Sequence, residues 1–206
     1  MAKRVAINGM GRIGRLVFRE LLGDADMELA AVNDPAEPEV IAYLLRHSTE
    51  HGPLPSGHTV EGTADALVVD GREVPAYREM DASRLPWKRL GIDLVLDCSG
   101  AYASKEKAQT HIDAGAARVL ISAAAGADVP TVVFGVNEHI LSDGDLIVSG
   151  ASCSTVGLTP LAKALNDFAP ISHGISTTIH ALTPSQMNLD DAQRNGNLRR
   201  SRTAST

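Results

Sequence analysis

A glycine-rich turn between a strand and a helix constrains this chain more than any other feature. The run "RVAIN" (Arg4–Asn8) is short and apolar and predicts a buried strand. It is followed by Gly9, Gly11 and Gly14 in the spacing G-x-G-x-x-G, and then by a segment with helical apolar spacing. These glycines permit a tight turn, close packing of helix on strand, and close approach of the backbone to a pyrophosphate. The pattern predicts the first unit of a dinucleotide-binding domain.

An acidic residue stands where such a domain needs one. Asp34 ends the second predicted strand, 27–34, and lies 20 residues after Gly14 (34 − 14). A carboxylate there accepts hydrogen bonds from the adenosine ribose and repels a 2′-phosphate, so NAD is favoured over NADP. The alternative is a glycine-rich turn with a helix-capping aspartate, which the alternation of strands and helices around it disfavours.

The rest of the first 150 residues continues this alternation. A helix is expected at 38–47, a hairpin around Asp70-Gly71, strands within 92–100, 117–125 and 131–137, and a helix within 103–116. We therefore predict an α/β fold with a Rossmann-type, doubly wound, mostly parallel sheet and helices on both faces. The predicted domains are 1–150, which binds NAD, and 151–206. The second offers one helix, one strand at 173–182 and a loop, too little for a core of its own.

Composition limits the classes of protein to be considered. The 206 residues carry a net charge of −6 and are 44% hydrophobic and 21% charged, as in soluble globular proteins. The acidic balance and an aromatic content of 3% disfavour nucleic-acid binding. No apolar run suits a membrane span or a signal peptide, and two cysteines suit a reducing compartment. We expect a cytoplasmic protein without a membrane or nucleic-acid partner.

A cysteine between two serines is the candidate nucleophile. In "ASCSTVG", Cys153 stands at the predicted start of a helix, where the dipole stabilises a thiolate and Ser152 or Ser154 could cap the turn. A nucleophilic thiol also needs a base, and His180 follows 27 residues later (180 − 153). Chemistry alone leaves a core cysteine and a structural histidine as the alternative. The histidines and cysteines show no metal-ligand spacing, so no metal site is predicted.

These segments resemble the phosphorylating glyceraldehyde-3-phosphate dehydrogenases. The segments that carry the resemblance are "INGMGRIGR", "AVNDP", "IAYLLRHSTEHG", "LPW", "DCSGAY", "LISAAA", "FGVNEH", "SGASCSTVGLTPLAKALND" and "ISTTIHALTPSQ". They follow the order and approximate spacing of that family and extend over nearly the whole chain. The resemblance favours a catalytic role for Cys153 and His180 over the alternative of a core cysteine and a structural histidine.

The resemblance implies a two-step oxidation, as part of glycolysis or gluconeogenesis. The Cys153 thiolate would attack the aldehyde of glyceraldehyde 3-phosphate, transfer of a hydride to NAD would leave a thioester, and inorganic phosphate would release 1,3-bisphosphoglycerate. His180 matches the base of the family, and Ser152, Thr183 and Arg200 resemble its phosphate contacts. The backbones of Arg12 and Ile13 would meet the pyrophosphate, and Ser99 and Ser122 match positions that line the cofactor groove. The resemblance also implies a homotetramer.

Several positions depart from the family pattern. Gly150 and Pro184 stand where asparagine is usual, and Val156 replaces the asparagine of a C-T-T-N motif. Substrate choice could therefore differ, and erythrose 4-phosphate or another aldehyde phosphate stays an alternative substrate. Family members also continue past the position of Thr206, so the α+β catalytic domain is expected to be incomplete. A catalytically silent NAD-binding module and a semialdehyde dehydrogenase are the other readings.

Overall fold

A mixed eight-stranded sheet organises the larger part of the molecule. The computed structural model describes residues 2–181 and 183, and its contacts divide the chain into two compact units, Met1–Phe168 and Ala169–Thr206. The described strands, all in the first unit, are β1 (Lys3–Asn8), β2 (Met27–Asn33), β3 (Val60–Gly62), β4 (Ala66–Val69), β5 (Arg72–Tyr77), β6 (Leu94–Asp97), β7 (Arg118–Ile121) and β8 (Ile147–Ser149).

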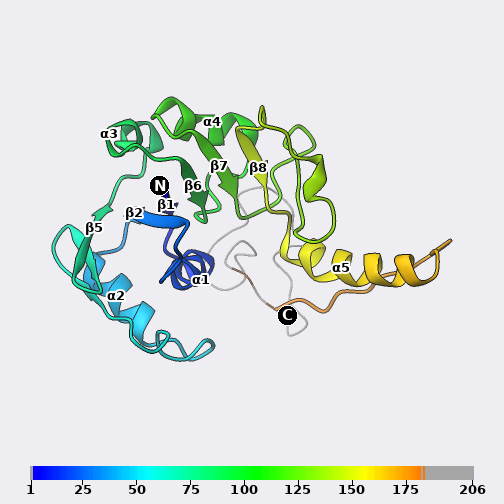
Figure 1. The fold of residues 1–206 in the computed structure, drawn as a ribbon, viewed down its shortest axis with the longest axis horizontal. Coiled ribbons are helices and arrows are strands. Elements are labelled where there is room, and N and C mark those ends of the chain that lie inside the picture. The colour runs from blue at the N-terminus through cyan, green and yellow to red at the C-terminus, as the bar shows by residue number, and fades with distance from the viewer. Residues whose placement is uncertain (1, 182, 184–206) are drawn as a thin grey trace, which may run out of the picture. The chain divides into compact units, whose positions relative to one another are not determined.

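The strand order identifies the topology. The order is β3-β4-β5-β2-β1-β6-β7-β8, and the run from β5 to β8 is parallel (Figure 1). Counted from β1 without the hairpin strands β3 and β4, this is the doubly wound order 3-2-1-4-5-6. The chain therefore moves outward from β1 in both directions, and the predicted Rossmann-type sheet is confirmed.

Helices lie against both faces of this sheet. The described helices are α1 (Arg12–Glu20), α2 (Pro38–Arg46), α3 (Trp87–Leu90), α4 (Lys105–Asp113) and α5 (Cys153–Phe168), with short 3-10 turns at Ala82–Arg84 and Glu138–Ile140. In β1, Ile7 packs in one core cluster with Phe18 of α1, whereas Ala6 packs in the other with Trp87 of α3. Alternate residues of a strand point to opposite faces, so a strand buried on both sides is apolar throughout.

The predicted hairpin is formed by β4 and β5, beside β3, which is the edge strand of the sheet. β4 and β5 pair antiparallel, with Val69 opposite Arg72. The two residues between them, Asp70 and Gly71, have φ of 51° and 79°, the left-handed values that a two-residue type I′ turn requires. The Asp-Gly dipeptide tolerates this backbone conformation, which explains why it is a reliable hairpin signal.

Two predicted strands are wrong. Within 131–137, only Thr131 forms an isolated bridge, to Ser149 beside β8, because the Asn137 side chain bonds the backbone of Val133 and Thr131 and folds the segment into a loop. Residues 173–181 of the predicted strand 173–182 adopt no strand, and Leu182 lies outside the described residues. Ile175 and Ile179 are fully exposed, and β-branched residues favour a strand only where a neighbour accepts its hydrogen bonds.

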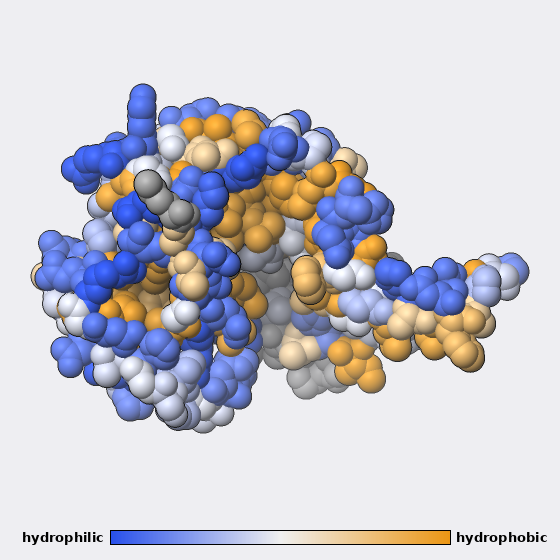
Figure 2. Space-filling model, in the orientation of Figure 1, coloured by the Kyte–Doolittle hydropathy of each residue, from blue (hydrophilic) through white to orange (hydrophobic). Residues whose placement is uncertain are grey.

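The helix α5 extends the strand–turn–helix predicted around Cys153. It has no buried residue along its 16 positions, although it carries Leu158, Leu161, Leu165 and Phe168. All four side chains are exposed, Phe168 at 90%, and Figure 2 shows an apolar surface along one side of this helix. Pro160 lies only seven residues after Cys153, and the helix continues through it.

Candidate active site

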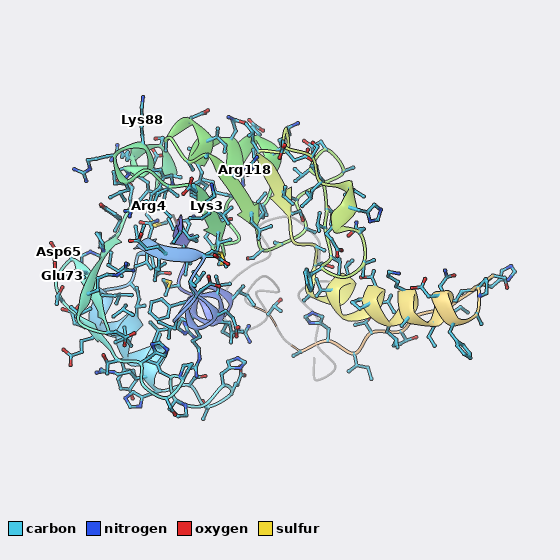
Figure 3. All side chains as sticks on the ribbon, in the orientation of Figure 1. Lys3, Arg4, Asp65, Glu73, Lys88 and Arg118 are labelled. Carbon is cyan, nitrogen blue, oxygen red and sulfur yellow. The ribbon has the colours of Figure 1, made fainter. Side chains whose placement is uncertain are left out.

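The candidate site residues of the first unit lie at the carboxyl ends of the parallel strands. β1 and β6 are neighbouring strands. After β1 the chain continues to β2 on one side, whereas after β6 it continues to β7 on the other. This is the switch point of the sheet, where open α/β sheets bind ligands. The opposite edge carries the strand starts, where Lys3 and Arg4 open β1 and Arg118 opens β7 (Figure 3). The glycine loop lies at this switch point, between β1 and α1, as the predicted strand–turn–helix required.

The three glycines of this loop differ in what a side chain would meet. Gly9 has φ of 94°, and a Cβ built on it would lie 2.6 Å from the Cα of Ser99 in the loop after β6. A Cβ on Gly14 would lie 1.9 Å from the carbonyl oxygen of Gly9. Both glycines therefore permit close backbone packing. Gly11 is exposed, and a Cβ there would meet nothing within 4 Å, so its open side is available to a ligand.

The start of α1 provides an anion-binding end. Gly11 is the N-cap and has no side chain to accept the first N–H groups of the helix, which begins at Arg12. Arg12 and Ile13 are both exposed at this first turn. Unpaired N–H groups and the helix dipole attract a phosphate, so the backbone here fits the pyrophosphate of a dinucleotide.

Asp34 lies directly after β2 beside the glycine loop. One carboxylate oxygen accepts the Met10 N–H at 2.7 Å, and the other accepts the Ala36 N–H at 2.9 Å. A carboxylate can accept about four hydrogen bonds, so two acceptor positions remain for ribose hydroxyls. The glycine cradle, the uncapped helix start and this partly exposed carboxylate together fit NAD.

Ser99 and Ser122 both lie exposed at the same edge, after β6 and β7. The Ser99 hydroxyl donates to Asp97 at 2.7 Å, and the Ser122 N–H donates to the Asp97 carbonyl at 2.9 Å. The structure therefore brings the predicted groove residues together around the end of β6.

The sequence analysis missed a row of buried, hydrogen-bonded polar side chains behind these serines. Asn8, Asn33 and Asp97 are each the last residue of a parallel strand, and all are at most 5% exposed. Because parallel strands end at one edge, polar residues closing three buried strands were the available signal. His111 of α4, fully buried, and Trp87 complete this row.

Cys153 is the first residue of α5 and is exposed. The Ser152 hydroxyl accepts the Thr155 N–H at 3.2 Å and so caps this helix, as expected of a serine at this position. Ala151 has φ of 67°, and its N–H donates to the Ser149 hydroxyl of β8 at 3.1 Å. A turn held at a strained angle thus sets the cysteine at a helix N-terminus, where a thiolate is stabilised.

The other cysteine has the opposite surroundings. Cys98 is partly buried after β6, and burial raises the pKa of its thiol to about 11, although a hydrogen bond with Ser122 opposes this. Since the thiolate is the reactive form, Cys98 is protonated and inert at neutral pH. Exposure and helix position single out Cys153 as the candidate nucleophile.

The remaining predicted residues fall in the second unit. His180 is exposed and Thr183 is partly exposed, whereas Arg200 lies outside the described residues. Cys153 and His180 belong to different units, so their pairing stays a prediction. Of the positions that depart from the family pattern, Gly150 is partly buried and donates its N–H to Ile121 at 2.8 Å, Val156 is 45% exposed on α5, and Pro184 lies outside the described residues.

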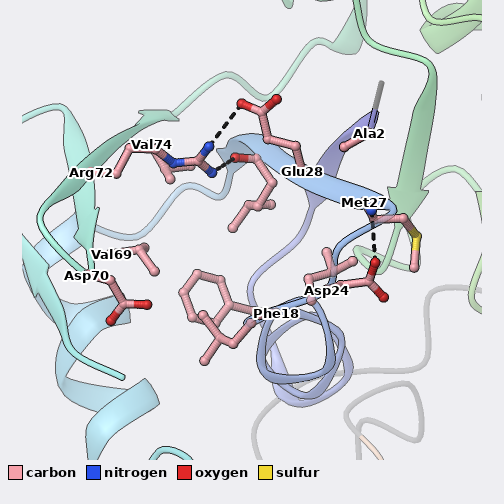
Figure 4. A pocket seen from close by; sticks show the side chains of 13 residues that line it. Ala2, Phe18, Asp24, Met27, Glu28, Val69, Asp70, Arg72 and Val74 are labelled. Carbon is pink, nitrogen blue, oxygen red and sulfur yellow. Dashed lines mark hydrogen bonds and ion pairs between the residues drawn. The ribbon is translucent and has the colours of Figure 1, made fainter. Parts of the chain in front are cut away.

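A pocket lies at the opposite end of the parallel strands, near the starts of β2 and β5. This pocket of about 420 Å³ is lined by Phe18, Met27 and Val74, with charged groups at its rim (Figure 4). Arg72 bonds the Glu28 carboxylate at 3.0 Å and the Leu29 carbonyl at 2.8 Å. The rim charges are engaged by the protein itself, and this pocket plays no part in the site described above.

A parallel sheet of this order, with a glycine cradle and an acidic residue at its switch point, defines a dinucleotide-binding protein of the Rossmann class. Residues 3–105 match the family model "Glyceraldehyde 3-phosphate dehydrogenase, NAD binding domain", and residues 152–206 match the corresponding C-terminal domain. The chain belongs to the glyceraldehyde 3-phosphate dehydrogenase family, and NAD is its cofactor.

Individual relatives agree with this assignment. The chain is 47% identical to the glyceraldehyde-3-phosphate dehydrogenase of Lactobacillus delbrueckii subsp. bulgaricus, over 99% of this chain and 61% of the relative. It is 46% identical to the one of Clostridium acetobutylicum, over 99% of this chain and 60% of the relative. The match to the one of Kitasatospora aureofaciens reaches 51% identity, over 91% and 56%. The chain thus spans about three fifths of the length of these relatives.

Among residues 2–181 and 183, no group of three or more histidine, cysteine or acidic side chains is arranged to hold a metal ion. Within the same described part of the chain, no helix has the length and apolar character needed to cross a membrane.

Proposed function

We propose that this chain contributes the NAD site and the nucleophile of a phosphorylating aldehyde dehydrogenase that oxidises glyceraldehyde 3-phosphate. The observation that carries the proposal is Cys153, exposed at the N-terminus of α5 and joined through the Ala151 turn to β8, a strand of the sheet that forms the NAD cradle. Because the chain spans about three fifths of its relatives' length, their activity is a proposal for it.

The chemistry assigned to Cys153 proceeds in two stages. Its thiolate attacks the aldehyde carbon, a C–S bond forms, and the carbonyl oxygen takes a proton to give a thiohemiacetal. NAD, when bound, supplies the hydride acceptor. The thioester that remains on Cys153 is cleaved by inorganic phosphate, which releases the acyl phosphate 1,3-bisphosphoglycerate and the thiolate. His180 is the proposed base that removes the hydroxyl proton.

Substrate phosphates are assigned to polar groups around this cysteine. Ser152, Thr183 and Arg200 are the proposed contacts, as their resemblance to the family pattern implies. The Ser152 hydroxyl lies 2.7 Å from the Thr155 hydroxyl, so a pair of hydroxyls stands at the start of α5 beside Cys153. The helix N-terminus favours an anion at the same place.

The domain division, assembly and location belong to the same proposal. We retain 1–150 as the NAD-binding domain and 151–206 as the start of the catalytic domain. A homotetramer in the cytoplasm is the form that the family resemblance implies. A sugar-phosphate aldehyde and inorganic phosphate are the proposed reactants.

NADH formation tests this proposal. The purified protein should reduce NAD when given glyceraldehyde 3-phosphate and phosphate, Cys153→Ser should abolish the reaction, and Cys98→Ser should retain it because Cys98 lies outside the proposed chemistry. Faster turnover of erythrose 4-phosphate would reassign the substrate. NAD binding without any NADH formation would favour the second candidate, a silent NAD-binding module, which the match of residues 3–105 to the NAD-binding domain of the family supports.

A further inference from the structure

Three members of the buried row lie where the two halves of the sheet meet. Asn33 ends β2, Asn8 ends β1 and Asp97 ends β6, and β1 lies between the other two strands. Each of them stands one or two positions before a residue of the proposed NAD site, namely Asp34, Gly9 and Ser99 respectively. In a doubly wound sheet, the halves on either side of the switch point each bind one nucleotide of a dinucleotide. The row therefore crosses from one half of the cofactor site to the other.

The backbone of Glu79 determines the direction of hydrogen bonding along this row. Asn33 donates from Nδ2 to the Glu79 carbonyl and accepts the Glu79 N–H at Oδ1, both at 2.9 Å. The opposite orientation of the Asn33 amide would set donor against donor and acceptor against acceptor. Asn33 Nδ2 also donates to Asn8 Oδ1 at 2.7 Å. The amide oxygen of Asn8 therefore faces β2, and its amide nitrogen faces β6.

Asn8 bonds a side chain on each side of β1. Its Oδ1 accepts from Asn33, and its Nδ2 donates to Asp97 Oδ1 at 2.8 Å and lies 3.4 Å from His111 Nε2. Asp97 Oδ1 also accepts the Ser99 hydroxyl at 2.7 Å and the Ser99 N–H at 3.4 Å. Asn8 thus links the end of β2 to the carboxylate that holds the Ser99 hydroxyl.

Burial makes the partners of these side chains hard to replace. Asn8, Asn33 and Asp97 are 3%, 5% and 1% exposed, so a lost hydrogen bond is not exchanged for one to solvent. Backbone bonds run beside the row, since the Gly9 N–H donates to the Asn33 carbonyl and the Cys98 N–H to the Asn8 carbonyl, both at 2.7 Å. Side chains and backbone together hold the starts of the three loops against one another.

We propose that Asn8 is a positioning residue that joins the two halves of the NAD site. Through Asn33 it holds the end of β2, where Asp34 is to receive the adenosine ribose. Through Asp97 it holds the Ser99 hydroxyl in the other half. Because Asn8 is buried, it acts on the dinucleotide only through these neighbours. The inference rests on the NAD site proposed above and adds to it the side chain that sets its two halves in register.

Exchange of the donor and acceptor ends of one hydrogen bond tests this proposal. Asn8→Asp keeps the shape of the side chain but sets a carboxylate against Asp97 across a 2.8 Å contact, so NAD affinity should fall about tenfold or more. Asp97→Asn alone should stay within about threefold of the unsubstituted protein. Its amide oxygen still accepts from Asn8 and Ser99, and its NH₂ takes the place of Oδ2, which bonds none of the described residues.

The double variant should restore the hydrogen bond in the opposite direction. In Asn8→Asp/Asp97→Asn the new amide donates to the new carboxylate, and the Ser99 hydroxyl can turn to accept from the same amide. This variant should bind NAD at least about threefold more tightly than Asn8→Asp alone. Calorimetric titration measures each Kd under conditions in which urea unfolding shows the variant to be folded. A purely structural role would lower stability and leave the Kd of the folded protein unchanged.

Asn33→Asp is the matched control. It also places a carboxylate in the row, against Asn8 Oδ1 and the Glu79 carbonyl, so NAD affinity should fall. Asn33 is joined to Asp97 only through Asn8, and adding Asp97→Asn should therefore give no gain. A normal Kd in Asn8→Asp, additive effects in the double variant, or equal rescue of Asn33→Asp would overturn the proposal.

Hydrogen exchange of the side-chain amides needs no variant to fold. By NMR of the unsubstituted protein, the Asn8 and Asn33 amide protons should exchange at least about a hundredfold more slowly than those of an asparagine peptide, and more slowly still with NAD bound. Exchange as fast as in the peptide would overturn the proposal. Failure of the unsubstituted protein to bind NAD would instead overturn the proposed site, whereas NAD binding that Asn8→Asp leaves unchanged would overturn this inference alone.

Discussion

The Asp34 carboxylate at the end of β2 accepts the Met10 N–H at 2.7 Å, across the turn that follows β1. One side chain therefore joins the second strand to the glycine loop and also presents acceptors to the ribose position. The bond from the Met10 N–H needs one acceptor oxygen and the bond from the Ala36 N–H needs the other, whereas rejection of a 2′-phosphate needs the negative charge.

Asp34→Asn should therefore weaken the discrimination against NADP. The amide keeps the shape and one acceptor oxygen but loses the charge that repels a 2′-phosphate, so the ratio of the Kd for NADP to that for NAD should fall about tenfold. Calorimetric titration with each dinucleotide measures this ratio. Asp65→Asn, at an exposed carboxylate far along the chain, is the control. An unchanged ratio in Asp34→Asn would contradict the assignment.

Two glycines of the same loop should respond differently to alanine. Gly9→Ala forces a Cβ to within 2.6 Å of the Ser99 Cα at a left-handed φ, so it should lower the free energy of unfolding by about 2 kcal/mol or more. Gly11→Ala meets no protein atom and should leave unfolding within about 0.5 kcal/mol of the original. Urea unfolding measures both.

NAD affinity completes this comparison of glycines. The Cβ in Gly11→Ala projects on the open side of the loop, where the pyrophosphate is expected, so the Kd should rise although the fold is unaffected. Normal NAD binding by Gly11→Ala would show that the dinucleotide does not approach the backbone there.

The two cysteines should differ in their reaction with iodoacetamide. At pH 7 only about one part in ten thousand of Cys98 is thiolate, given its pKa of about 11, so labelling of Cys98 should be very slow at pH 7 and rise about tenfold per pH unit toward that value. Cys153, exposed at the start of α5, should be labelled at pH 7 and faster than a model thiol. Peptide mass spectrometry after timed quenching distinguishes the sites, and Cys98→Ser isolates Cys153. Labelling of Cys153 no faster than the model thiol would argue against an activated nucleophile.

His111 should make stability depend on pH in the mildly acidic range. Burial lowers its pKa in the folded protein, so its contribution is complete above the unfolded pKa of about 6.5 and is lost as pH falls below that value. His111→Gln cannot titrate, so its stability deficit relative to the unsubstituted protein should shrink between about pH 7.5 and 5.5, by at most about 1.4 kcal/mol per pH unit.

Urea unfolding at both pH values measures this change in the deficit. His139→Gln, which removes an exposed histidine, is the control for the loss of an imidazole. A constant deficit for His111→Gln would mean that the buried ring keeps the ordinary pKa.

Local patterns predicted the elements whose hydrogen bonds are satisfied locally or by adjacent strands. The run before Gly9, the hairpin at Asp70 and the turn into Cys153 were read correctly because apolar periodicity and turn chemistry decide them. The segment at 131–137 has the same apolar, β-branched character but is a loop, because the Asn137 side chain occupies its backbone groups. No local pattern reports such a bond.

The sequence by itself determined the doubly wound class, the glycine cradle, the position of Asp34 after the second strand and the choice of Cys153 as candidate nucleophile. Each of these depends on residue type at fixed spacing along the chain. Only the tertiary structure decided which residues meet at the switch point. It brought together Asn8, Asn33 and Asp97 from three strands, and it set His111 against Trp87. It also separated an inert Cys98 from an exposed Cys153. The physical reason is that burial and hydrogen-bond partners depend on residues distant in sequence, which only the packing of the sheet brings together.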